Sequence, residues 1–197
     1  MKNLGARSIL AVVIPERSAA YQILALNTEK AHNLREKSLE VIRMYRELAQ
    51  LEERSEEDYG LEFEEPAFIT LGLCYESRPR FSGGAYHPML KRVDQFLKGP
   101  LGRSIEQRKR LTQRLLEIDD IVSEKVQQLK TRGLNNPYLK AFVVARINPV
   151  RFKPKGSSMP SLGETLEKVF VSAQKFDPVR IKTEDLAKSG APPETAE

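Results

Sequence analysis

Apolar residues recur at three- and four-residue steps along two stretches of the chain, a spacing typical of amphipathic helices. From Pro15 to about Arg54 there is no glycine and no further proline, so we predict one or two helices there. Their apolar stripe consists of Leu34, Val41, Ile42, Tyr45, Leu48 and Leu51. A second stripe predicts a long helix from Ser104 to Arg132, ending near Gly133. It consists of Leu111, Leu115, Ile118, Val122, Val126 and Leu129. The two stripes are expected to pack against each other.

Two predicted helix starts carry the pattern of a capping box. In this motif a serine side chain accepts from the backbone amide three residues later, and a glutamate or glutamine at that position reaches back. Ser104 with Gln107 forms the first pair, and Ser161 with Glu164 forms the second. The second pair predicts a further helix that ends at about Lys175.

Glycine and proline interrupt residues 56–89 so often that we predict a long irregular connection there. The interruptions are Gly60, Pro66, Gly72, Pro79, Gly83, Gly84 and Pro88. The apolar run AFITLGLCY at 67–75 favours a short β-hairpin within it. Residues 183–197 are polar, small and proline-bearing, which is typical of a disordered tail. The predicted fold is therefore mainly α, one helical bundle over 1–182 with an irregular insertion, followed by that tail.

One apolar and basic segment occurs twice. AFVVARINPVRFK at 141–153 aligns with VFVSAQKFDPVRIK at 169–182 once a single inserted residue is allowed. Each copy predicts a short apolar helix, a stop where the residue before proline is forced out of the α region, and an extended end. Alternate residues of an extended chain point the same way, so we expect Val150 and Phe152 to anchor the first copy on the core. A repeat this short can also arise by chance.

The net charge of +5 is distributed unevenly along the chain. Residues 29–65 hold twelve acids and six bases, whereas 91–132 hold eleven bases and six acids and 140–182 hold nine bases and three acids. The end from Thr183 onward is acidic again. A basic second half favours a polyanionic partner, because lysine and arginine near phosphates release condensed counterions. The alternative is that charged helices simply present solvated faces.

Residues able to carry chemistry are few. His32 and His87 lie far apart and have no carboxylate or cysteine at a metal-ligand spacing. Cys74, the single cysteine, lies in an apolar run and is expected to be a small buried hydrophobe rather than a nucleophile. Neither a GxxxxGK[ST] nor a GxGxxG phosphate-binding pattern occurs. We therefore expect no catalytic activity, no metal site and no cofactor.

The composition is that of a soluble protein. With 197 residues, of which 40% are hydrophobic and 30% charged, the chain is long enough to bury a core. A single cysteine permits no intramolecular disulfide, which suits a reducing compartment. The run ILAVVI near the N-terminus is too short for a secretory signal, and no run approaches the roughly 20 apolar residues of a membrane span. We expect a cytoplasmic location and no membrane partner.

The stretch NPYLKAFVVARINPVRF at 136–152 resembles the C-terminal helical region of the large subunit of type I-D CRISPR effector (Cascade) complexes, and the similarity extends over 90–182. In that antiviral family the same region also serves as a free small subunit. The resemblance implies a non-catalytic helical bundle that contacts neighbouring copies, the large subunit and the backbone subunits. It also implies binding to the target or displaced DNA strand, which stabilises the R-loop, and contact with guide RNA. The nuclease and polymerase-like regions of the large subunit have no counterpart here.

The residues expected to contact nucleic acid are chosen by local charge, because the resemblance transfers no motif. The first set comes from the repeat and the loop between its copies: Lys140, Arg146, Arg151, Lys153, Lys155, Lys175, Arg180 and Lys182. A second row shares one side of the long helix: Arg103, Arg110 and Arg114. Both sets would neutralise phosphates without reading bases. The row can equally pair with acids on neighbouring turns, namely Glu117, Asp120 and Glu124.

Two other functions remain open. An independent DNA-binding protein of a mobile element would insert a recognition helix into the major groove, but no compact helix-turn-helix spacing is found. A pure assembly subunit would instead dock its basic half onto an acidic protein surface, such as residues 29–65 of a neighbouring copy. That subunit would not bind nucleic acid on its own.

Overall fold

Helices make up most of the computed structural model, which describes residues 33–154 and 157–188. The elements, in which η marks a 3-10 helix, are α2 (Leu34–Leu51), η2 (Glu57–Tyr59), α3 (Gly60–Phe63), α4 (Pro66–Ser77), α5 (Gly83–Val93), α6 (Leu101–Thr131), α7 (Leu139–Ile147), α8 (Leu162–Lys175), η3 (Pro178–Arg180) and α9 (Thr183–Lys188). No β-strand occurs in the described ranges, so the prediction of a mainly α helical bundle is confirmed.

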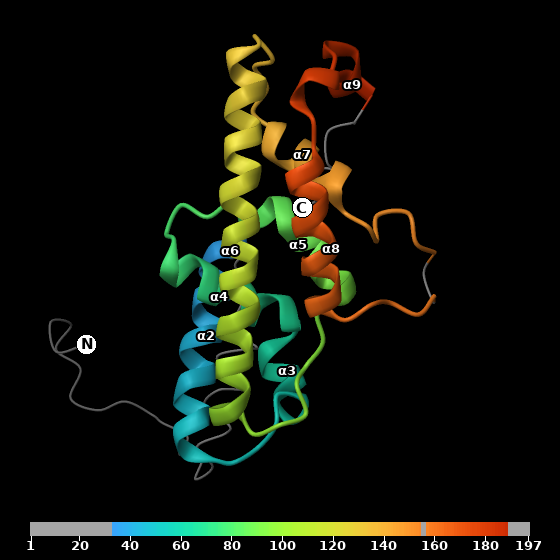
Figure 1. Cartoon of the computed structure of the whole chain (residues 1–197). Coiled ribbons are helices and arrows are strands. Elements are labelled where there is room, and N and C mark those ends of the chain that lie inside the picture. Colours follow the sequence, from blue (N-terminus) through green and yellow to red (C-terminus); the bar gives the residue numbers. More distant parts are fainter. Residues whose placement is uncertain (1–32, 155–156, 189–197) are drawn as a thin grey trace, which may run out of the picture. The chain divides into compact units, whose positions relative to one another are not determined.

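The longest helix, α6, is the element around which the others are arranged (Figure 1). α4 and α8 pack against it most extensively, and α7 lies beside its C-terminal half. α2 packs mainly against α4 and contacts α6 less, for example where the Tyr45 hydroxyl donates to the Leu101 carbonyl over 3.0 Å. The expectation that α2 is the main partner of the α6 stripe is therefore wrong, because α4 and α8 take that role.

The predicted irregular connection at 56–89 is instead largely helical, and α4 lies where a hairpin was expected. All residues from Ala67 to Tyr75 are buried, so the helix is apolar on every side and shows no stripe. Periodicity alone cannot distinguish such a buried helix from a buried strand. Pro66 lies at the start of the helix, where its missing amide proton breaks no helical hydrogen bond.

Gly72 allows α4 and α2 to approach closely. A Cβ added to this residue would lie 2.3 Å from the Ser38 carbonyl oxygen and 2.9 Å from the Cβ of Ile42, which is closer than real side chains come. The glycine that suggests a break in the sequence is therefore a packing residue between two helices.

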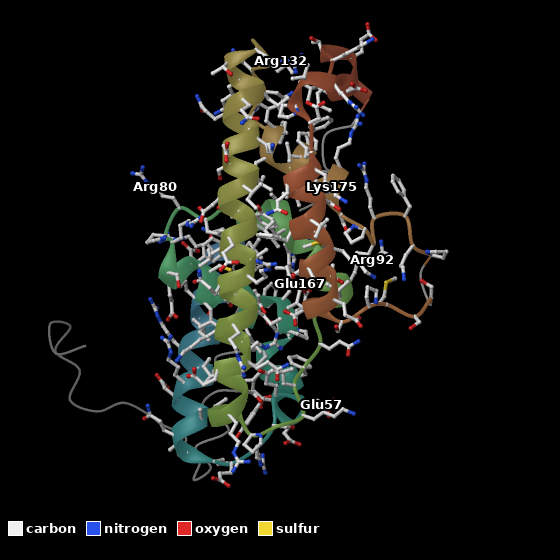
Figure 2. All side chains as sticks on the ribbon, viewed as in Figure 1. Glu57, Arg80, Arg92, Arg132, Glu167 and Lys175 are labelled. Carbon is white, nitrogen blue, oxygen red and sulfur yellow. The ribbon has the colours of Figure 1, made fainter. Side chains whose placement is uncertain are left out.

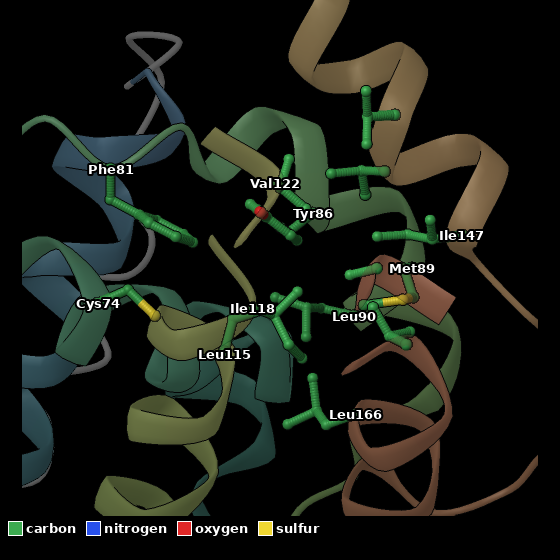
Figure 3. Packing of buried hydrophobic residues seen from close by; sticks show 14 of the residues in the cluster. Cys74, Phe81, Tyr86, Met89, Leu90, Leu115, Ile118, Val122, Ile147 and Leu166 are labelled. Carbon is green, nitrogen blue, oxygen red and sulfur yellow. The ribbon is translucent and has the colours of Figure 1, made fainter. Parts of the chain in front are cut away.

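Side chains from five helices meet in the core (Figure 3). The cluster includes Cys74 of α4, Tyr86, Met89 and Leu90 of α5, Leu115, Ile118 and Val122 of α6, Ile147 of α7 and Leu166 of α8. Cys74 is buried, as the sequence predicts. Burial raises the pKa of its thiol, which disfavours the reactive thiolate form.

Two helix ends match the prediction. α6 ends at Thr131, and Gly133 follows with a φ of 85°, a left-handed conformation that glycine adopts readily after a helix. α8 begins with the expected capping box, because the Ser161 side chain accepts from the Glu164 amide and the Glu164 carboxylate accepts from the Ser161 amide. Both ends could be predicted because their signals are local.

Two other boundaries differ from the prediction. α6 begins at Leu101 rather than at a capping box on Ser104, whose hydroxyl donates instead to the Gly99 carbonyl. The predicted disordered tail starts with α9, so residues 183–188 are helical. The rest of that tail and the first 32 residues, which include His32, lie outside the described residues.

Candidate nucleic-acid interface

The two copies of the repeated segment share one local hydrogen bond at the ends of α7 and α8. After α7 the side chain of Asn148 accepts from the backbone amide two residues on, over 3.0 Å, and after α8 Asp177 does the same over 2.9 Å. Such bonds are typical of Asx turns. Only the second copy continues as a 3-10 helix, η3, so the two copies share the start of the turn and differ after it. We call residues 148–153 turn 1 and residues 177–182 turn 2.

Both ends are turns and not the extended segments predicted, so side chains do not alternate between core and solvent. In turn 1, Val150 is buried as expected, but Phe152 is 87% exposed. In turn 2 the pattern is reversed, with Val179 72% exposed and Ile181 buried. The expected anchoring of Phe152 on the core is therefore wrong.

An arginine from a different helix holds each turn by its backbone. Arg92 of α5 donates to three carbonyl oxygens of turn 1 over 2.5 to 3.1 Å. Arg132 follows α6 and donates to three carbonyl oxygens of turn 2, including that of Val179 over 3.0 Å. Figure 2 shows Arg92 beside the loop that follows α7 and Arg132 at the upper end of α6. Because carbonyl groups occur in every residue, nothing in the sequence marks these two arginines.

Turn 1 carries an exposed aromatic ring between two exposed cations. The Arg151 guanidinium lies 5.1 Å from the Phe152 ring centroid, and the Lys153 ammonium donates to the Ser158 carbonyl over 3.2 Å. The sequence from 125 to 163 contains no acidic residue. Its eight bases are Lys125, Lys130, Arg132, Lys140, Arg146, Arg151, Lys153 and Lys155. The charge totals over 91–132 and 140–182 do not reveal this acid-free stretch, because both ranges also contain acidic residues.

The bases around turn 2 have acidic neighbours. Arg180 pairs with Asp177 of the same turn over 3.3 Å, although its side chain is 86% exposed. Arg146 of α7 pairs with Asp185 of α9, also over 3.3 Å. The two other predicted cations here are exposed, namely Lys175 and Lys182. The positive charge of turn 2 is therefore partly neutralised within the chain.

Two predicted contact residues are paired with acidic residues of the chain itself. The Lys140 ammonium lies 2.6 Å from a carboxylate oxygen of buried Asp119. Arg114 donates to both carboxylate oxygens of Glu167, over 2.9 and 2.6 Å, and to Glu117 over 2.9 Å. These hydrogen bonds raise the pKa of Arg114, and those to Glu167 join α6 to α8. For Arg114 the alternative of pairing with an acid on a neighbouring turn is confirmed.

The remaining predicted residues are divided between separate places. Arg103 and Arg110 are exposed on the first turns of α6. That end of α6 is well separated from turn 1 in Figure 1. Lys155 lies outside the described residues. The structure therefore brings only Arg151 and Lys153 of the predicted set together in turn 1.

Arg108, which the sequence did not single out, is the centre of a buried cluster of charges. Its five N–H groups donate to Glu56 (3.0 and 2.6 Å), Asp94 (2.5 Å), the Thr70 hydroxyl (3.1 Å) and the Gln95 carbonyl (2.8 Å). Burial alone would lower the pKa of Arg108, but the carboxylates of Asp94 and Glu56 raise it. Burial raises the pKa of Asp94. Since every N–H group of Arg108 is used, we interpret the cluster as structural.

A second buried cluster surrounds Asp119. This carboxylate accepts from Arg78 and from the Tyr86 hydroxyl, both over 2.9 Å, in addition to its pairing with Lys140. Burial and the adjacent Asp119 raise the pKa of Tyr86, so the phenol stays protonated. Among the described residues, no group of three or more histidines, cysteines and carboxylates is placed to hold a metal ion.

Comparison with known proteins yields no relative. No protein family, no curated protein and no solved structure matches the chain. In the part of the chain that the structure describes, no helix has both the length and the apolar character needed to cross a membrane. Turn 1 has a fixed backbone, and its two cations pair with no acidic residue among the described parts of the chain, so we build the proposed function on this surface.

Proposed function

We propose that this chain holds a nucleic-acid strand by its phosphates, through turn 1, without reading base sequence. The observation that carries the proposal is the pair of exposed cations, Arg151 and Lys153, on a turn that Arg92 fixes within an acid-free stretch of chain. Cations opposite phosphates gain free energy by releasing condensed counterions. A fixed backbone loses little conformational entropy on binding, which favours affinity. Contacts to phosphates position a strand but carry no sequence information.

The resemblance to the small subunit of type I-D CRISPR effector complexes suggests in which assembly this strand-holding activity would be used. In RNA-guided complexes base pairing with the guide supplies specificity, so a subunit that holds the target or displaced strand needs no base readout. We therefore propose a non-catalytic, cytoplasmic subunit that stabilises the R-loop and contacts the other subunits of such a complex. The sequence resemblance alone supports this wider role.

Fluorescence anisotropy of short labelled single strands and duplexes of unrelated sequence, repeated over a salt series, tests the phosphate contacts. We expect dissociation constants roughly in the micromolar range that do not depend on sequence and rise steeply with salt. The double variant Arg151→Gln and Lys153→Gln should reduce the slope of log K against log salt by about 1.4, because each lost phosphate contact changes it by about 0.7 for single strands.

The matched control is the double variant Arg180→Gln and Lys182→Gln in turn 2, which removes the same charge from a turn that contains Asp177. We expect a smaller change of slope for this variant. Equal changes would show that only net charge matters. No binding by the wild type at low salt would overturn the proposal and favour the assembly subunit, which sedimentation at low and high salt would then reveal as salt-sensitive self-association.

A further inference from the structure

Phe152 is 87% exposed, although phenylalanine is among the residues most often buried. Single exposed apolar side chains are common and need no explanation by themselves. The position of Phe152 differs from the ordinary case because the turn beneath it is fixed. Val150 is fully buried on one side, and Arg92 holds the carbonyl groups of Arg151 and Lys153, which flank the ring.

The second copy shows that this type of turn does not itself force the side chain outward. Ile181 aligns with Phe152 but is only 7% exposed, in a turn that Arg132 holds by other carbonyl groups, those of Pro178, Val179 and Ile181. The aligned position is therefore occupied by a buried aliphatic residue in one copy and by an exposed aromatic ring in the other.

We propose that Phe152 is a stacking platform for an unpaired base of the strand whose phosphates Arg151 and Lys153 hold. This inference rests on the proposed function and adds single-stranded nucleic acid as the ligand. Every base has a π face, so stacking on an aromatic side chain tolerates any sequence. The Arg151 guanidinium, 5.1 Å from the ring centroid, lies where a planar cation can also stack on the bound base.

The flanking charges favour a nucleotide over an apolar pocket of a partner protein. Such a pocket would remove water from Arg151 and Lys153 as it enclosed the ring, and burying unpaired charges is strongly unfavourable. A nucleotide offers a flat apolar face to Phe152 and phosphates to both cations. The surface therefore matches the chemistry of a single strand.

The chain contains no tryptophan, so Phe152→Trp introduces a single fluorescent reporter that keeps an aromatic ring at this position. The probes are an oligodeoxythymidine strand and an abasic strand with the same number of phosphates. We expect the thymidine strand to quench the tryptophan fluorescence and the abasic strand to leave it unchanged. Val179→Trp, at the exposed position of turn 2, is the control and should respond to neither strand.

Phe152→Leu keeps an apolar side chain but removes the π face. We expect it to weaken binding of the thymidine strand by roughly five- to tenfold and to leave binding of the abasic strand unchanged, since stacking contributes about 1 kcal/mol or more per base. The ring is exposed, so thermal unfolding of the variant should match that of the wild type.

The outcomes separate the two proposals. Wild-type affinity of Phe152→Leu for the thymidine strand, or equal quenching by both strands, would overturn the stacking platform while the salt-dependent phosphate contacts remain. Failure of the wild type to bind either strand at low salt would overturn the proposed function together with the platform. Binding of both strands with quenching by neither would also overturn the platform and would leave an apolar protein partner as the alternative occupant of Phe152.

Discussion

At the scale of single residues, Arg108 connects parts of the chain that lie far apart in sequence. It stands on α6 and bonds to Glu56 before η2, to Thr70 on α4 and to Asp94 after α5. The Tyr45 hydroxyl of α2 lies 3.2 Å from a carboxylate oxygen of Glu56, so its one proton is shared between Glu56 and the Leu101 carbonyl. Moving these charges out of water costs free energy, which their mutual attraction offsets. Removing one partner leaves the others buried without compensation and therefore lowers the stability of the protein.

We expect Arg108→Gln to lower the free energy of unfolding by about 3 to 5 kcal/mol, because it leaves the carboxylates of Glu56 and Asp94 buried without a cation. Urea unfolding followed by circular dichroism measures the change. Arg110→Gln, two residues along the same helix but exposed, should change the free energy by less than about 0.5 kcal/mol. Similar losses in the two variants would show that the buried cluster contributes nothing specific.

The sequence predicts individual residues well when their partners are nearby. It offered the pairing of Arg114 with Glu117 as an alternative to a phosphate contact and predicted the burial of Cys74, since one depends on helix geometry and the other on an apolar run. It gave no indication of Arg92 or Arg108. The partners of those arginines become neighbours only after the helices have packed, and many of them are backbone carbonyl groups.

At the scale of elements, a helix can be predicted from the sequence when it buries one face and is difficult to predict when it is buried on all sides. α6 and α8 each bury one face, and the stripe and end of α6 and both ends of α8 were predicted correctly, whereas the start of α6 was not. α4 is buried on all sides and therefore has no stripe to recognise. The ends of the repeat were predicted to be extended because proline stops a helix. They are turns instead, and the arginines that bind their carbonyl groups, Arg92 and Arg132, lie elsewhere in the sequence.

The contact between α2 and α4 leads to a prediction about Gly72. We expect Gly72→Ala to lower the free energy of unfolding by about 1 to 3 kcal/mol, because the added methyl group would lie 2.3 Å from the Ser38 carbonyl oxygen and overpack the interface. Gly102→Ala on α6 meets no atom within 4 Å and should be neutral or stabilise by up to about 1 kcal/mol. Thermal unfolding of both variants checks the difference. An unchanged free energy of unfolding for Gly72→Ala would mean that α2 and α4 can move apart without a loss of stability.

At the scale of the whole molecule, the described bases do not form one continuous surface. Charge sums along the sequence predicted a basic second half, but Lys140 is paired with buried Asp119 and Arg114 with Glu167 on α8. The other described cations of the predicted set stand on different elements: the first turns of α6, turn 1, α7, the end of α8 and turn 2. α6 alone, with 31 residues, spans roughly 45 Å. Net charge along the sequence favours a polyanionic partner, and the three-dimensional placement of the cations is the reason why we propose turn 1 as its contact.

This separation predicts where a bound strand protects the protein. Hydrogen exchange followed by mass spectrometry, with and without an oligodeoxythymidine strand, should show slower exchange in peptides that cover turn 1 and no change over the first turns of α6, where Arg103 and Arg110 are exposed. High salt should remove the protection, because it weakens the phosphate contacts. Protection that extends along α6 from Arg103 would instead show that the strand follows the arginine row. The contact surface would then have to be reassigned to that helix.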